Sequence, residues 1–426
     1  MSSVVAPASA DAANSAALAN QQDAQLRQRA AKVVPGGMTG HLNAAALPAG
    51  YPQFFERGQG CRIWDVDGNA YIDFMCSWGP NLLGHHHPEV DAAAARQQAL
   101  GDCLNGPTPR FFELAERFVA RSAHADWVLF QKNGTDATTV SVMVARAATG
   151  KRKVLVATKA YHGADPWCTP VPNGITAEDR AHLIYYTYND VASLEAAVAI
   201  AGDDLAAIVC SAFKHDIGVD QELPKPEFAQ RARALCDKAG AALILDEVRA
   251  GYRMHAGGSW ETVGVRPDLS AWSKSIANGY ALAAVTGVDA LRDAATRIYT
   301  TGSFWSGGVA MAAGLATLEV AESEDVVGHV QRMGQRFRDG IAAQATSHGV
   351  GVRQTGPAAL PLILFDNDPG VDRGAVFTAE ALRRGVYLHP RHNMFLSLAH
   401  TEQDIDLALQ ATDAAFALVA QRFGSH

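Results

Sequence analysis

The chain has 426 residues, of which 48% are hydrophobic and 19% charged, a balance typical of a folded globular protein. Its 36 Lys and Arg against 44 Asp and Glu give a net charge of −8 at pH 7, which argues against nucleic acid and acidic membranes as partners. No apolar stretch approaches the ~18 residues that a membrane helix requires. The six cysteines lack CxxC spacing, which predicts reduced thiols, no structural zinc and a cytoplasmic location.

The N-terminal part predicts a helix and a hairpin. Residues 1–20 are rich in Ala and Ser and lack the charged and apolar regions of a secretory signal, so we expect a disordered leader. A polar helix is expected at 21–33, where Pro-Gly-Gly at 35–37 stops it. Residues 62–74 alternate in polarity on either side of an Asp-Gly-Asn turn, which predicts a β-hairpin.

In the middle of the chain, short apolar runs alternate with segments of helical length. The expected strands are 127–130, 154–157, 183–186, 206–210, 241–245, 269–272 and 282–286. The helical pattern between and after them includes 226–239, 309–323 and 327–348. Such strands, rich in Val, Ile and Leu and separated by helices, predict an α/β fold with a mostly parallel central sheet covered on both faces.

Beyond about residue 330 the pattern changes to a smaller α+β domain. Helices at 374–384 and 402–420 flank two short apolar strands near 360–365 and 395–398. We expect the following division: a leader at 1–20, an N-terminal segment at 21–75 that packs with the small domain, a large domain at 76–325 and a C-terminal small domain at 326–426.

The strongest chemical feature is an acid and a lysine on two successive strand ends. The run 241–245 ends in Asp246, and the carboxyl ends of parallel strands are where α/β folds bind ligands. An acid here also suits a plain helix cap. The next run delivers Lys274, and a lysine on an apolar strand end is unfavourable unless it is paired or used. The pair suggests pyridoxal phosphate, with Lys274 forming a Schiff base and Asp246 holding the pyridinium proton.

Such a cofactor needs a phosphate cradle and an aromatic face. Residues 132–139 lie between a strand and a helix, so free N–H groups at that helix start suit a dianion, although most such starts are ordinary caps. Tyr161 follows the next strand and offers a ring, or is a surface aromatic. Neither nucleotide-binding glycine motif occurs. The three adjacent histidines at 85–87 cannot all face one ion, so no metal is expected.

Taken together, these motifs resemble the class III, fold-type I aminotransferases over residues 30–420. They are Ser77-Trp78-Gly79-Pro80, Asn133-Gly134-Thr135, Tyr161-His162-Gly163, Asp246-Glu247-Val248, Lys274 and Thr301-Gly302-Ser303-Phe304. The resemblance implies a large domain that binds pyridoxal phosphate, with Lys274 as the Schiff-base lysine and Asp246 as the partner of the ring nitrogen.

The same resemblance assigns the remaining cofactor contacts and the assembly. It implies that Tyr161 stacks on the ring and that Gly134 and Thr135 donate hydrogen bonds to the phosphate. In this family a hydroxyl of the Gly-Thr-Phe loop reaches the phosphate bound in the neighbouring subunit. Ser303 stands at that place here, so a homodimer with shared sites is implied.

The substrate is suggested by departures from one branch of the family. Residues 398–402 resemble the glutamate-1-semialdehyde aminomutases, which carry an arginine that grips the substrate carboxylate. Asn43 stands at that place, and a neutral amide cannot replace a bidentate guanidinium. The combination of 36–38, 132–134, 303–305 and the block from His389 to Phe395 looks most like the hydrolysed-fumonisin aminotransferases, which use pyruvate to deaminate a long aliphatic amine.

We therefore expect a transaminase that moves an amino group from a bulky, carboxylate-free amine to a keto acid such as pyruvate, by ping-pong chemistry. Trp78, Trp305 and Arg391 are the candidate substrate contacts, with Arg391 for the acceptor carboxylate. Trp305 also suits a dimer contact, Arg391 a surface loop, and Arg253 competes for the acceptor. The alternatives are an intramolecular 1,2-aminomutase, disfavoured by Asn43, and a regulator that only binds pyridoxal phosphate, disfavoured by the missing basic patch.

Overall fold

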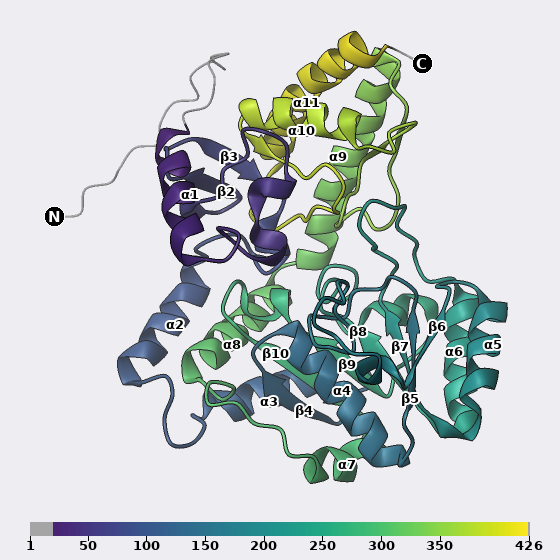
Figure 1. Cartoon of the computed structure of the whole chain (residues 1–426). Helices are drawn as coiled ribbons and strands as arrows, with labels where there is room; N and C mark the ends of the chain where they lie inside the picture. Colours follow the sequence, from purple (N-terminus) through teal and green to yellow (C-terminus); the bar gives the residue numbers. More distant parts are fainter. Residues whose placement is uncertain (1–19, 425–426) are drawn as a thin grey trace.

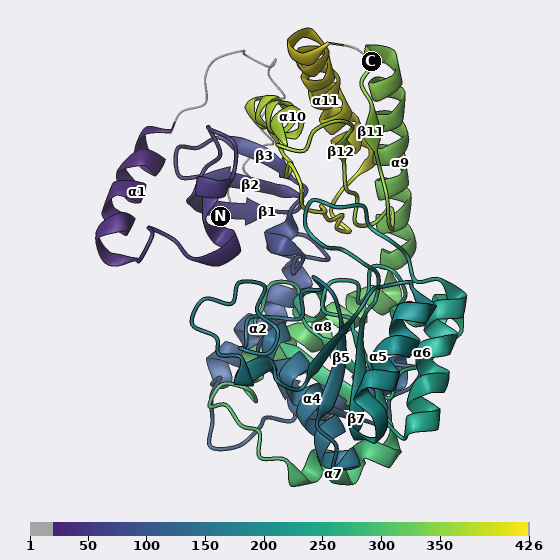
Figure 2. The same ribbon diagram turned by 45° about the vertical axis from the view of Figure 1, so that its right-hand side comes forward.

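The computed structural model describes residues 20–424, so the leader expected at 1–20 lies almost wholly outside the described residues. Figure 1 shows a large lobe built around one sheet and, above it, a smaller lobe in which the purple segments around β2 and β3 lie beside the yellow-green C-terminal helices. Figure 2 shows the same arrangement from a second direction. Within residues 20–424 none of the helices has the length and apolar character needed to cross a membrane.

The large lobe contains a seven-stranded sheet with the order β4-β10-β9-β8-β7-β5-β6. Its strands are β4 (Trp127–Gln131), β5 (Lys153–Ala157), β6 (Leu183–Tyr186), β7 (Leu205–Ser211), β8 (Ala242–Asp246), β9 (Leu269–Trp272) and β10 (Ala283–Gly287). Strands β5 to β9 run parallel, whereas β10 is antiparallel to both β9 and β4. The predicted α/β fold with a mostly parallel sheet is thus confirmed, and β10 is the exception that strand patterning did not reveal.

Helices cover both faces of this sheet because neighbouring residues of each strand point to opposite sides. On β7, Ile208 packs in the cluster that includes α5 and α6, and the next residue, Val209, packs in the cluster that includes α4. The helices of this lobe are α2 (Pro88–Leu100), α3 (Arg110–Arg121), α4 (Gly134–Thr149), α5 (Val191–Ala201), α6 (Pro226–Ala239), α7 (Arg292–Arg297) and α8 (Gly308–Ser323).

The smaller lobe joins the two ends of the chain through a second sheet, with the order β1-β2-β3-β13. Its elements are α1 (Gln21–Val33), β1 (Phe55–Gln59), β2 (Arg62–Asp65), β3 (Ala70–Asp73), α9 (Val326–His348), β11 (Val352–Arg353), β12 (Leu364–Phe365), α10 (Asp372–Arg383), β13 (Val386–Tyr387) and α11 (Glu402–Phe423). The antiparallel β2–β3 pair is the hairpin expected from the sequence, and β13 pairs in parallel with β3. The domain boundaries at 75 and 325 stay a prediction.

One expected strand is absent: residues 395–398 form no strand in the part of the chain that the structure describes. The backbone N–H groups of Phe395, Leu396 and Leu398 donate to carbonyl oxygens of three separate segments, at Phe74, Ala359 and Leu82. A ladder needs consecutive partners on one neighbouring strand, so this apolar run is extended and buried without joining a sheet. The prediction of a strand there was wrong for that reason.

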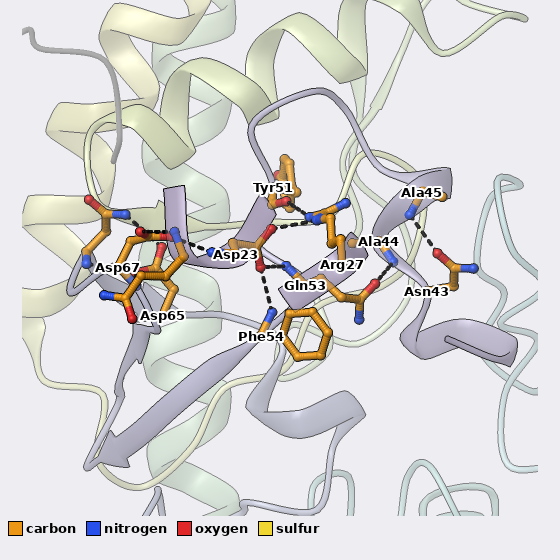
Figure 3. Close-up of polar contacts among 12 residues, drawn as sticks. Asp23, Arg27, Asn43, Ala44, Ala45, Tyr51, Gln53, Phe54, Asp65 and Asp67 are labelled. Atoms are coloured by element: carbon orange, nitrogen blue, oxygen red, sulfur yellow. Dashed lines mark hydrogen bonds and ion pairs between the residues drawn. The ribbon is translucent and has the colours of Figure 1, made fainter. Parts of the chain in front are cut away.

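Side chains tie the N-terminal helix to the hairpin (Figure 3). Asp67, in the hairpin turn, accepts hydrogen bonds from the N–H groups of Gln22 and Asp23, which caps the free donors at the start of α1. The Asp23 carboxylate in turn accepts from the N–H groups of Gln53 and Phe54. These contacts hold α1 and the chain up to β1 as one unit with the hairpin.

Candidate active site

The sheet brings the predicted acid and lysine to the same edge. Asp246 is the last residue of β8 and lies level with Ala271 of β9 in the parallel ladder. Strand β9 ends at Trp272, and Lys274 begins the short helix η7 (Lys274–Ala277). Because β8 and β9 are parallel neighbours, their carboxyl ends open on one side of the sheet, where α/β folds bind ligands.

The environment of Lys274 favours its neutral amine. Burial lowers the pKa of Lys274 well below its usual value, the nearby Arg249 lowers it further, and Asp246 acts in the opposite direction. The backbone of Lys274 is left-handed, with φ of 53°, a conformation that disfavours residues other than glycine by about 1–2 kcal/mol. Such strain is typical of functional sites, and a neutral amine is the form that attacks a carbonyl carbon.

Asp246 is buried, with 6% of its surface exposed, and both carboxylate oxygens have donors. His162 Nδ1–H donates to Oδ2 over 2.7 Å, and the N–H of Val248 donates to Oδ1 over 3.0 Å. The Nε2 atom of His162 is buried and has no hydrogen-bond partner among the described residues. The carboxylate is therefore held in place at the strand end by one donor from the loop after β5 and one from its own loop.

The start of α4 leaves two backbone donors free. Asn133 and Asp136 form a capping box, in which Asp136 N–H donates to the Asn133 side chain and Asn133 N–H donates to the Asp136 carboxylate. Within residues 20–424 the N–H groups of Gly134 and Thr135 have no acceptor. These are the two residues that the sequence predicts to bind a phosphate, and a helix start carries the positive potential that a dianion needs.

Two glycines show that the loops after β4, β5 and β8 lie against one another. A Cβ on Gly134 would come within 2.8 Å of a methyl of Val248, two residues past Asp246. A Cβ on Gly163 would come within 2.6 Å of the Thr135 hydroxyl, and that hydroxyl accepts from the N–H of Ala164. The helix start that carries Gly134 and Thr135 is therefore adjacent to the Asp246 strand end.

The other predicted cofactor contacts have different surroundings. Tyr161 has 41% of its surface exposed and lies within electrostatic reach of Asp246 and Arg249. Ser303 is exposed, and its hydroxyl forms no hydrogen bond within residues 20–424. Trp305, two residues further, is half-buried and packs on the core cluster beneath α4. The single chain thus assembles Lys274, Asp246 and the helix start, but leaves Ser303 apart from them.

Trp78 lies in a group of uncharged rings. Its indole packs edge-on against the imidazoles of His41, His389 and His392, at centroid distances of 4.9, 5.5 and 4.9 Å. Burial lowers the pKa of His389 to about 4 and that of His392 well below its usual value, and it also lowers the pKa of His41. Because Lys274 and Arg249 contribute to the shift at His41, this group lies beside the lysine.

Three arginines are candidates for binding the carboxylate of a substrate: two suggested by the sequence and one added by the structure. Arg391, the sequence candidate, has an exposed side chain without a hydrogen bond or ion pair in the described residues. Arg253 is 0% exposed, and its guanidinium lies 5.2 Å from the centroid of the Phe395 ring. Arg249 is partly exposed, and burial of its guanidinium lowers its pKa to about 10, although the negative charge of Asp246 and the nearby Tyr161 act in the opposite direction.

Sequence reasoning gave no role to His162, Arg249, His392 or Asn393. The sequence offered only one indication for two of them: His162 directly follows Tyr161, and Arg249 lies three residues past Asp246. Their partners are distant in the chain: His162 and Asp246 are 84 positions apart, and Arg249 and His392 are 143 apart. Such pairs depend on the fold and are not visible in local patterns.

Asn43, which stands where the aminomutase branch has an arginine, is occupied by its own loop (Figure 3). Its side-chain oxygen accepts from the N–H of Ala45 over 2.9 Å, and its amide nitrogen donates to the carbonyl of Met38 over 2.9 Å. The side chain therefore acts as a local cap. It offers neither the charge nor the length with which an arginine would bind a substrate carboxylate.

Comparison with known proteins agrees with this geometry. A family model described as aminotransferase class-III matches residues 46–416. The aminopentol aminotransferase of Sphingopyxis macrogoltabida is 48% identical over 400 residues, which cover 94% of this chain and 95% of that relative. A glutamate-1-semialdehyde 2,1-aminomutase of Brevibacillus brevis is 32% identical over 419 residues, covering 92% of this chain and 97% of that relative.

Among solved structures, the pyridoxal-phosphate internal aldimine form of the FumI protein of Sphingopyxis sp. MTA144 superposes with a TM-score of 0.93 at 47% identity. The superposition covers 95% of this chain and 97% of that one. The resemblance noted from the motifs is thereby confirmed across the large sheet and the small lobe alike. This chain belongs to the class III aminotransferase family and is a pyridoxal-phosphate-dependent aminotransferase.

Proposed function

We propose that this aminotransferase takes its amino group from a bulky amine without a carboxylate beside the amine, and passes it to a keto acid such as pyruvate. The observation that carries the chemistry is the meeting of Asp246 and Lys274 at the ends of two parallel strands. The choice of donor is supported by Asn43, whose side chain caps its own loop, and by the uncharged rings around Trp78. The 48% identical relative is named for an aminopentol substrate.

The residues present fit pyridoxal phosphate. The N–H groups of Gly134 and Thr135 would hold its phosphate, and Tyr161 would cover its ring. Asp246, whose carboxylate is held in place by His162 and Val248, would hold a proton on the ring nitrogen. Bound there, the cofactor supplies an electron-withdrawing ring that stabilises negative charge at the carbon bearing the amino group.

Lys274 has two tasks in this proposal. In the resting enzyme its neutral Nζ would hold the cofactor at the cofactor's carbonyl carbon. Once a substrate amine has taken that place, the freed Nζ would accept a proton from the carbon that bears the amino group and return it. Both tasks need the unprotonated amine at neutral pH, and the lowered pKa of Lys274 provides it.

A panel of amines tests the donor and the reaction together. With pyruvate as acceptor, long aliphatic amines should be deaminated at higher kcat/KM than amino acids of similar length, because no arginine at position 43 binds the donor carboxylate. The measurement is alanine formation in the presence and absence of pyruvate. Isomerisation of glutamate-1-semialdehyde without any keto acid would instead establish a 1,2-aminomutase. Cofactor binding without turnover of any amine would favour the regulator.

We also propose that the enzyme is a homodimer in which Ser303 serves the cofactor of the neighbouring subunit. Ser303 lies on an exposed loop, and the adjacent Phe304 has 67% of its surface exposed. The loop around Leu104, 56% exposed, is bound to the same region through a hydrogen bond from Gly308 N–H to Asp102 O. Large exposed apolar side chains support a partner surface. A cytoplasmic location stays a prediction.

Shared sites predict complementation between two inactive subunits. In Ser303→Asp the added charge should repel a phosphate, and Lys274→Ala lacks the reactive amine. A mixed dimer would contain one site with both Lys274 and an intact Ser303, so random mixing should restore roughly a quarter of wild-type activity. The measurement is kcat after co-refolding of the two chains, with each parent refolded alone as control. If Ser303 acts within its own chain, mixing restores nothing.

A further inference from the structure

Arg249 is a half-paired cation at the active site that the reaction described so far does not use. Its Nη1 donates to His392 Nε2 over 2.8 Å and to Asn393 Oδ1 over 2.5 Å. Its Nε is buried without a hydrogen-bond partner, and no carboxylate forms an ion pair with it in residues 20–424. A buried donor without an acceptor is unfavourable, so this edge of the guanidinium is suited to an anion from outside the chain.

His392 and Asn393 fix the orientation of the guanidinium. His392 Nδ1–H donates to the Asn393 carbonyl over 2.6 Å, so in the neutral ring Nε2 carries the lone pair that accepts from Arg249. The low pKa of His392, caused by burial and by Arg249, maintains that neutral ring. The Asn393 amide donates to Met394 O, which leaves Oδ1 as the acceptor. Both acceptors therefore bind Nη1, and Nε remains buried and unpaired.

Arg249 lies near the groups that react. It follows Asp246 by three residues, and its partner His392 packs against Trp78 with 4.9 Å between the ring centroids. Its charge helps to lower the pKa of Lys274, and the charges of Asp246 and Tyr161 raise its own pKa against the effect of burial. A guanidinium offers two parallel N–H donors, from Nε and the second terminal nitrogen, which match the two oxygens of a carboxylate. A donor amine without a carboxylate cannot accept these two hydrogen bonds, whereas the carboxylate of a keto acid can.

We propose that Arg249 binds the carboxylate of the keto-acid acceptor through its Nε edge, and that His392 and Asn393 are the residues that position it. This assignment rests on the proposed transaminase function. It differs from the sequence candidate Arg391, whose side chain is exposed. It also differs from Arg253, whose guanidinium nitrogens likewise have no hydrogen-bond partner in residues 20–424, but whose whole side chain is 0% exposed, whereas the Arg249 side chain is partly exposed.

The decisive experiment compares two acceptors of equal length, pyruvate and propanal, of which only pyruvate has a carboxylate. In Arg249→Gln, kcat/KM for pyruvate should fall roughly 10- to 100-fold more than kcat/KM for propanal or the rate of the amine half-reaction, because only pyruvate loses a charge-assisted contact, whereas the altered charge beside Lys274 affects all three. The matched control is Arg152→Gln, because Arg152 precedes the amino end of β5, whereas the active site lies at the carboxyl ends of the strands. Propionate, which carries the same carboxylate, can be titrated against the aminated enzyme by cofactor absorbance. It should bind to Arg249→Gln more weakly than to the wild-type enzyme by a similar factor.

Further variants separate the possible outcomes. Asn393→Ala should raise KM for pyruvate roughly 3- to 10-fold with kcat kept, because the guanidinium loses one of its two anchors. Equal losses with pyruvate and propanal in Arg249→Gln would overturn the proposal, and so would selective loss of pyruvate in Arg391→Gln. Failure of the wild-type enzyme to transaminate any amine with either acceptor would instead contradict the proposed function itself.

Discussion

Replacing Lys274 with alanine is expected to lower kcat by at least about 10³-fold, because the variant loses both the amine that attacks the cofactor and the base that moves the proton. The left-handed turn at the end of β9 places Lys274 at the same strand ends as Asp246, whose charge acts on the pKa of the Lys274 amine. The measurement is steady-state kcat together with the amount of cofactor that remains bound.

Two controls make this result specific. Lys153→Ala removes an amine at the start of β5, where Nζ donates to the carbonyls of Ile200 and Ala201, and should keep full turnover. Added small amines such as ethylamine should restore part of the proton transfer in Lys274→Ala, since a free base can replace a missing one. Borohydride reduction of the wild-type enzyme should fix the cofactor on Lys274. Fixation on a different lysine would contradict the assignment.

Changing Asp246 to asparagine is expected to lower kcat by roughly 10²- to 10⁴-fold, the range for losing a group that stabilises charge or holds a proton in the reaction. The amide is nearly the same size, and Val248 N–H can still donate to its oxygen. A neutral amide, however, cannot stabilise a protonated ring nitrogen. Cofactor binding should change far less than turnover, which absorbance titration and steady-state kinetics measure separately.

Glu247→Gln is the matched control, because it makes the same substitution at the adjacent position. Glu247 is 0% exposed and accepts from the N–H and hydroxyl groups of Ser259, away from the strand-end site. Burial raises the pKa of Glu247 to about 7, which favours the neutral carboxyl group and makes the neutral amide a close substitute. Similar losses in the two variants would indicate a structural defect and contradict the role given to Asp246.

Several parts of the fold followed from the sequence alone, because they depend on contacts near in the chain. The apolar run before Asp246 and the run before Lys274 are short, rich in strand-forming residues and bounded by turns, so β8 and β9 were predictable. The capping residues Asn133 and Asp136 mark the start of α4 in the same local way. The order of these motifs along the chain predicted the family, the cofactor and the candidate site residues.

Other features were decided by the tertiary structure, because each joins segments that are distant in the chain. The direction of β10 depends on how the chain crosses the sheet, and the strand expected at 395–398 failed because its N–H groups meet three different segments. The partner of Asp246, His162, and the two anchors of Arg249 come from separate loops that only the folded chain brings together. Local patterning identifies which side chains carry the chemistry, but their hydrogen-bond partners and pKa values depend on burial and on neighbours that the fold supplies.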